Sequence, residues 1–222
     1  MPQALPIPAL LGGFQQLQIL APHPSDEVLG AAGLLQFALA YGLDVQVHIL
    51  TDGEMCFGRQ AKAQETFLRT ARRKESCLAA QLLGYALPQF WDMGDGQLTE
   101  RQAELSRRIQ QHHTDATLWL GPWFADGHPD HNATGQTLAA LRVPALYYPV
   151  WALVDPPRLA QFQAGSSRTC LFLSDEQQRR KAEAAQLFTS QLAPGQREEE
   201  AIVQTEHLRH FVTEQEMYWY EN

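Results

Sequence analysis

Short apolar runs alternate with longer segments of helical periodicity along most of the chain. Strands are predicted over 17–21, 44–51, 88–92, 117–124, 145–151 and 168–174. Helices are predicted over 27–42, where apolar residues recur every three or four positions, and over 60–83, 97–113, 131–142 and 175–191. The proline-rich stretch 155–158 is interpreted as part of a loop, and the tail 197–222 is expected to be helical with an aromatic end packed on the domain.

The strand–helix–strand repetition over the first 150 residues indicates an α/β protein. We expect a Rossmann-like, mostly parallel sheet with helices on both faces and a C-terminal extension. The 222 residues suit a single domain, with a core over about 15–150 and a C-terminal elaboration over about 151–222.

Composition narrows the classes of partner. The formal net charge of -8 and the lack of a basic cluster argue against nucleic acid. The start of the chain lacks a basic leader, and no apolar run is long enough to span a membrane, so a cytoplasmic protein is expected. Three scattered cysteines form no disulfide framework, which fits a reducing compartment. The sequence leaves the oligomeric state open.

Two polar clusters follow predicted strands. His23 and Asp26 come after the first strand, and His128 to His131 come after the strand at 117–124. Because ligands bind beyond the carboxyl ends of parallel strands, both clusters are expected at the same edge of the sheet. Imidazole and carboxylate are zinc ligands, and iron or another divalent metal accepts them too. The first strand is not followed by Gly-x-Gly-x-x-Gly, which argues against a dinucleotide-binding oxidoreductase.

These motifs resemble a known family. The segment APHPSDEVLG (21–30) is similar to the A-H-P-D-D-E motif of the LmbE-like N-deacetylases, a zinc-dependent group that includes the N-acetylglucosaminyl-phosphatidylinositol de-N-acetylases. GHPDHNATG (127–135), LTDGE (50–54), RRKESCLAAQLLG (72–84) and KAEAAQLFTSQ (181–191) resemble later motifs of the same family. The resemblance implies zinc-dependent hydrolysis of an N-acetyl group on an amino sugar or its conjugate, with release of acetate.

The resemblance also implies roles for individual residues. It implies that zinc is bound by His23, Asp26 and His131. It further implies that His128 stabilises the oxyanion, that Asp130 orients that side of the site, and that Arg72 contacts the substrate. A histidine that donates to a developing oxyanion contributes roughly 3 kcal/mol in comparable enzymes.

Ser25 departs from the family pattern at the position of the general base. A hydroxyl is no base near neutral pH, and base catalysis contributes roughly 10²–10⁴-fold. One explanation is a base supplied elsewhere, by Asp52, Glu54 or Asp130. A second is a metal-binding pseudoenzyme or sugar-binding protein, and a third is a substitution introduced to trap a complex. A role for Ser25 as a nucleophile is a further possibility, but the residues around it do not form the Gly-x-Ser-x-Gly turn that exposes such serines.

Overall fold

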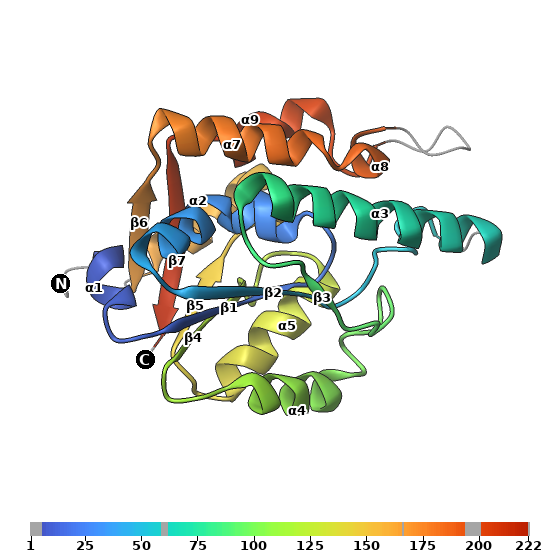
Figure 1. Cartoon of the computed structure of the whole chain (residues 1–222). Helices are drawn as coiled ribbons and strands as arrows, with labels where there is room; N and C mark the ends of the chain where they lie inside the picture. The colour runs from blue at the N-terminus through green and yellow to red at the C-terminus, as the bar shows by residue number, and fades with distance from the viewer. Residues whose placement is uncertain (1–5, 59–61, 166, 194–200, 222) are drawn as a thin grey trace.

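One mixed sheet organises the molecule. The computed structural model describes residues 6–58, 62–165, 167–193 and 201–221, and within them the strand order is β3-β2-β1-β4-β5-β7-β6 (Figure 1). The strands are β1 (Gln16–Ala21), β2 (Asp44–Ile49), β3 (Gln89–Phe90), β4 (Thr117–Pro122), β5 (Ala145–Tyr148), β6 (Arg168–Phe172) and β7 (Gln215–Glu221). Strands β1 to β5 pair in parallel, and β7 pairs antiparallel with both β5 and β6. The predicted mostly parallel α/β fold is confirmed.

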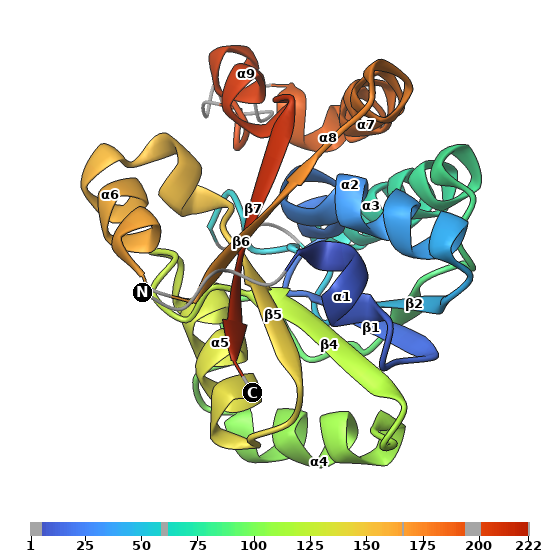
Figure 2. The same ribbon diagram turned by 90° about the vertical axis from the view of Figure 1, so that its left-hand side faces the viewer.

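Helices cover both faces of the sheet (Figures 1 and 2). One face carries α2 (Asp26–Tyr41), α3 (Lys62–Leu83) and α7 (Asp175–Gln186), and the other carries α4 (Gln102–His112) and α5 (Pro129–Ala140). The remaining helical elements are α1 (Ile7–Leu11), η1 (Trp151–Val154), α6 (Pro156–Ala164), α8 (Thr189–Leu192), η2 (Thr205–His207) and α9 (Leu208–Phe211).

Burial explains why these segments take these forms. In β1, Leu17, Ile19 and Leu20 are fully buried, as expected for a central strand covered on both sides. Helix α2 is apolar around most of its circumference because it lies between the sheet and its neighbours α3 and α7. Each face of the sheet therefore has its own hydrophobic core, one around α2 and one around α4 and α5.

Two local expectations need correction. The stretch 155–158 is not all loop, because α6 begins at Pro156 and the Asp155 side chain accepts a hydrogen bond from the Arg158 N–H. Proline is well suited to the first turn of a helix, where its missing N–H costs nothing. The helix expected over 175–191 is divided at Phe188 into α7 and α8. Positions 60 and 61 of the helix expected over 60–83 lie outside the described residues.

The helical interpretation of the tail is wrong over the part that is described. The described residues of the tail form the short elements η2 and α9 and then enter the sheet as β7. Glu216 of β7 is buried, pairs with Lys181 Nζ of α7 at 2.7 Å, and accepts hydrogen bonds from the N–H groups of Gly33 and Leu34 in α2. The tail therefore fixes α2 and α7 against the sheet. Within the described residues, no helix is long and apolar enough to span a bilayer.

Candidate active site

The loop after β1 carries the first group of candidate residues. β1 ends at Ala21, and α2 begins at Asp26 after a turn in which Ser25 has a φ of 93°. The Asp26 carboxylate folds back over this turn, and its Oδ2 accepts a hydrogen bond from the His23 backbone N–H at 2.8 Å. The same oxygen lies 3.3 Å from Nδ1 of the His23 ring. The turn therefore presents an imidazole and a carboxylate to one point.

The loop after β4 carries the second group. His128 is the N-cap of α5, and its Nδ1 accepts a hydrogen bond from the Asp130 backbone N–H at 3.2 Å. His131 lies in the first turn of α5, fully buried, with its Nδ1 2.8 Å from Oδ2 of Asp126. Its other ring nitrogen, Nε2, lies 3.1 Å from Oδ2 of Asp26.

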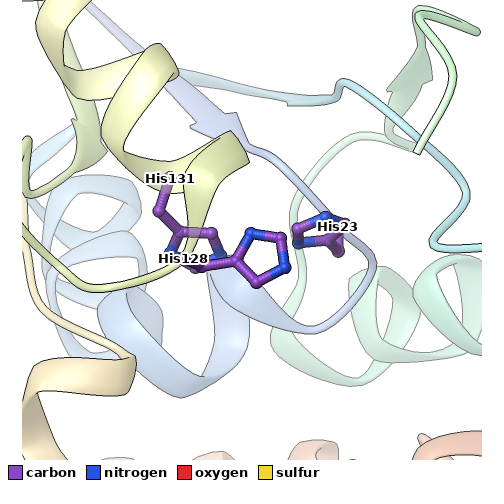
Figure 3. A group of neighbouring side chains, drawn as sticks. All are labelled: His23, His128 and His131. Carbon is purple, nitrogen blue, oxygen red and sulfur yellow. The ribbon is translucent and has the colours of Figure 1, made fainter. Parts of the chain in front are cut away.

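The two loops meet at the adjacent carboxyl ends of β1 and β4. Oδ2 of Asp26 lies close to both His23 Nδ1 and His131 Nε2, so the three predicted metal ligands are brought together. The rings of His23, His128 and His131 form a close group where α5 begins (Figure 3), and one ligand atom from each lies within 4.8 Å of the others. This geometry is compatible with a bound metal ion.

The donor set fits a divalent cation. His131 Nε2 is buried and has no hydrogen-bond partner among the described residues, although Asp26 is near. Asp126 accepts from the opposite ring nitrogen, as outer-shell carboxylates do for metal-binding histidines. Among the described residues, the clusters of possible ligands contain no cysteine, and a set without thiolates is typical of catalytic rather than structural zinc sites.

Neighbouring carboxylates favour the charged form of His23 and His131. Burial would lower the pKa of His131, but Asp26 and Asp126 outweigh it and raise that pKa to about 9. Burial likewise opposes charge on His23, whose pKa is nonetheless raised well above its usual value by Asp130, Asp26 and Asp95. A cation at this point would therefore replace protons held by the two rings.

His128 behaves in the opposite way. Its burial and the neighbouring rings of His23 and His131 lower its pKa to about 4, so the ring is neutral at pH 7. Because Nδ1 accepts a hydrogen bond from Asp130 N–H, the single ring proton is on Nε2. His128 is thus a hydrogen-bond donor beside the predicted metal ligands.

Asp95 is a functional candidate that the sequence interpretation missed. It follows β3, and its Oδ1 lies 3.1 Å from Nε2 of His23, while Asp130 Oδ2 lies 3.2 Å from the same nitrogen. Burial would raise the pKa of Asp95, but the hydrogen bond and charge of His23 lower it, so the carboxyl is ionised at neutral pH. The signal available in the sequence was its position in DMGDG, just beyond a predicted strand.

A pocket of about 160 Å³ opens onto these groups. Its lining includes His23, Ser25, Asp26, Asp95, His128 and the predicted substrate contact Arg72. Arg72 is buried, and its Nη1 donates to the Gly53 carbonyl at 2.8 Å. Gly53 has a φ of 63°, and a Cβ there would lie 1.9 Å from that nitrogen, so a larger residue would displace the Arg72 guanidinium. Arg72 Nε and Nη2 are buried without a partner among the described residues, which leaves donors for a ligand.

Ser25 is tied to the C-terminal part of the protein. Its Oγ donates to Oε1 of Gln191 in α8 at 3.2 Å, and Gln191 Nε2 donates to the Pro24 carbonyl. The hydroxyl hydrogen is therefore directed at an amide oxygen, not at an imidazole that could activate it. This arrangement argues against Ser25 as a nucleophile.

Two of the carboxylates considered as replacement bases are engaged elsewhere. Asp52 pairs with Arg73 at 2.7 Å, and Glu54 pairs with Arg69 at 2.9 Å. Neither lines the pocket that contains His23 and Ser25. Asp130, the third, accepts hydrogen bonds from the N–H groups of Gly96 and Leu98 as well as contacting His23. These bonds fit a positioning role.

Comparison with known proteins gives a family match. The model of the family described as PIG-L, GlcNAc-PI de-N-acetylase, matches residues 18–141. The diacetylchitobiose deacetylase of Thermococcus kodakarensis is 31% identical over 121 residues, which are 52% of this chain and 45% of that protein. The match thus spans less than half the length of the relative.

Solved structures share the fold. The zinc-inhibited form of teicoplanin deacetylase Orf2 superposes with a TM-score of 0.66 at 18% identity, covering 92% of this chain and 97% of the other. GalB, the 4-carboxy-2-hydroxymuconate hydratase of Pseudomonas putida KT2440, gives a TM-score of 0.60 at 17% identity, covering 94% and 95%. Since a hydratase and a deacetylase share this fold, the fold alone does not determine the reaction.

Proposed function

This chain belongs to the PIG-L family of GlcNAc-PI de-N-acetylases, and from that premise we propose that it hydrolyses the N-acetyl group of an amino sugar or its conjugate, releasing acetate. The observation that carries the proposal is the approach of His23 Nδ1 and His131 Nε2 to one oxygen of Asp26, at 3.3 and 3.1 Å.

His23, Asp26 and His131 would hold the metal ion, for which zinc is the first candidate and iron an alternative. When bound, the ion would act as a Lewis acid on the amide carbonyl and make water a stronger nucleophile at neutral pH. Asp126 keeps His131 in the orientation that points Nε2 toward Asp26. Asp130 holds His23 in the same manner from the other side.

His128 and Arg72 supply hydrogen-bond donors to the substrate. The neutral His128 ring, with its proton on Nε2, would donate to the oxygen that becomes negative as the carbonyl is attacked. The unpartnered donors of Arg72 would bind oxygen atoms of the sugar.

Asp95 is our candidate for the base that Ser25 cannot supply. Apart from the proposed metal ligand Asp26, it is the carboxylate among the residues that line the pocket. It is ionised at neutral pH and is held in place by the Met55 N–H at 2.8 Å. In this proposal Asp95 accepts a proton from the attacking water.

The test is acetate release from N-acetylglucosamine conjugates by metal-loaded protein, with Ser25 and Asp95 changed singly and together. We expect Asp95→Asn to lower kcat by about 10²–10⁴-fold, the usual contribution of a general base. Restoring the family's carboxylate with Ser25→Asp should make the protein much less sensitive to Asp95→Asn. The matched control is Asp92→Asn, because Asp92 lies on the same loop and its side chain is 55% exposed.

Two outcomes would contradict the assignment of Asp95. Asp95→Asn could lower kcat/KM equally in the native protein and in Ser25→Asp, mainly by raising KM. That result would make Asp95 a substrate-binding residue. No acetate release by the native protein, with strong activity after Ser25→Asp, would favour the alternative function of a metal-binding pseudoenzyme. The observation behind that alternative is the Ser25 hydroxyl bound to Gln191.

A further inference from the structure

A second hollow adjoins the candidate active site. It has a volume of about 420 Å³ and is lined by Gly127, His128, Trp151, Asp155 and Arg158, together with Asp126 and Val154. His128 and Trp151 also line the pocket that contains His23 and Asp26, so the two hollows meet at these residues. The inner pocket, at about 160 Å³, is smaller than the roughly 300–1,000 Å³ typical of ligand sites. A substrate larger than the reacting group therefore needs further space, and the outer hollow offers it next to His128 and Trp151.

Trp151 is fixed relative to the metal ligands by Asp126. Oδ2 of this buried carboxylate lies 2.8 Å from Nδ1 of His131 and accepts the Trp151 backbone N–H at 3.0 Å. Its Oδ1 accepts the N–H groups of Val150 and Ala152, at 2.9 and 3.0 Å. Asp126 thus holds both the turn that carries Trp151 and His131, the histidine that would bind metal. A group packed on Trp151 would be held at a defined distance from the reacting centre.

The far wall of the hollow is polar. Arg158 Nε pairs with Asp155 Oδ2 at 2.9 Å, and the two side chains are 43% and 40% exposed. Gly127, with a φ of 105°, makes room for this arginine, because a Cβ there would lie 2.9 Å from Arg158 Nε. The hollow therefore combines a half-buried indole with a guanidinium and a carboxylate that reach solvent.

We propose that the outer hollow binds a second sugar, joined to the N-acetylated sugar in the inner pocket. An indole offers an apolar surface for one face of a pyranose ring, and the Arg158–Asp155 pair offers donors and acceptors for its hydroxyl groups. A lipid chain would find two charged side chains on this wall, which disfavours that occupant. The proposal rests on the proposed deacetylase function and narrows the substrate class to N-acetylated disaccharides and longer oligosaccharides.

The experiment compares kcat/KM for N,N′-diacetylchitobiose with kcat/KM for N-acetylglucosamine in metal-loaded protein. The native protein should prefer the disaccharide by tenfold or more, and Arg158→Ala should reduce this preference about tenfold, as losing one specific contact usually does. Arg179→Ala is the matched control, because Arg179 forms a similar pair with a carboxylate three residues earlier, Glu176, on the exposed side of α7. The control should keep the native preference.

Equal kcat/KM values for the two substrates, or a preference unchanged by Arg158→Ala, would overturn the proposal. An alkyl glycoside of N-acetylglucosamine preferred as strongly as the disaccharide would also overturn it, by assigning the hollow to an apolar group. If no substrate releases acetate, the proposed function has failed, and binding tests the hollow on its own. In that case the native protein must bind N,N′-diacetylchitobiose more tightly than N-acetylglucosamine, and Arg158→Ala must remove the difference.

Discussion

At the scale of single residues, the site depends on which nitrogen of each histidine faces Asp26. His131 directs Nδ1 to Asp126 and Nε2 to Asp26, whereas His23 directs Nε2 to Asp95 and Asp130 and Nδ1 to Asp26. A carboxylate on the remote nitrogen sets the ring orientation and strengthens the other nitrogen as a ligand. The metal affinity of the protein should therefore depend on residues that do not touch the metal.

Replacing Asp126 with Asn tests this dependence. An amide lacks the charge of the carboxylate. Its NH₂ group is also a donor, and it would face another donor if it pointed to the Trp151 N–H or to a protonated His131 Nδ1. We expect the affinity for zinc to fall about 10–100-fold, the usual effect of losing such a partner. Competition with a zinc-chelating dye measures it, and Asp155→Asn, at the cap of α6, is the control. Unchanged zinc affinity in Asp126→Asn would show that His131 is not a ligand.

The sequence pointed to the candidate ligands and to Asp130, but not to Asp95 or Asp126, and the reason is physical. His23, Asp26, His128 and His131 lie in two short motifs next to strands, where local spacing limits how far apart the side chains can be. Asp95 and Asp126 lie in loops whose paths depend on packing elsewhere in the fold. Nothing in the sequence near Asp126 indicates that its carboxylate accepts three backbone N–H groups from the turn at 150–152.

At the scale of elements, strands and helices of the parallel core were predictable and the tail was not. β1, β2 and β4 are continuous apolar or alternating runs, α3 has clear helical periodicity, and α2 is an apolar run too long for a strand. β7 contains a buried glutamate, and its position between β5 and β6 depends on pairing with strands far away in the sequence. Charged residues before β7 favoured a helical interpretation, which tertiary pairing overrides.

One strand contains a histidine whose burial should make stability depend on pH. His48 of β2 is fully buried, with Nε2 2.6 Å from Gln18 Oε1 and its ring against Trp91, Trp119 and His112. Burial, with a smaller effect of His112, lowers the pKa of His48 to about 3, from about 6.5 when unfolded. The unfolded chain therefore binds a proton that the folded protein excludes, and stability falls as the pH drops below 6.5.

We expect this histidine to cost about 2 kcal/mol of the free energy of unfolding between pH 8 and pH 5. Urea denaturation of native protein and His48→Gln at both pH values measures the effect. At pH 8, the two proteins differ in free energy of unfolding only through effects unrelated to the ionisation of His48. At pH 5, the free energy of unfolding of His48→Gln should have risen relative to that of the native protein. Parallel losses of stability in both proteins would contradict the assignment.

At the scale of the whole molecule, the sheet topology makes the site. Because β1 and β4 are adjacent and parallel, the loops that follow them meet at one edge, and residues far apart in the sequence become neighbours. The C-terminal part of the chain also contributes, since β7 holds α2 in place and α8 supplies the partner of Ser25. The adjacency of the two loops followed from the parallel sheet and was predictable, whereas the closure by the tail was not.

The most direct test of the account is the position of the metal in crystals of zinc-loaded protein, located by anomalous diffraction. The account predicts one peak about 2.0–2.2 Å from His23 Nδ1, Asp26 Oδ2 and His131 Nε2. The structure also groups possible ligands on the other side of the His23 ring, at His23 Nε2, Asp95 and Asp130. A peak there would contradict the account. The absence of any peak near these histidines would contradict it as well.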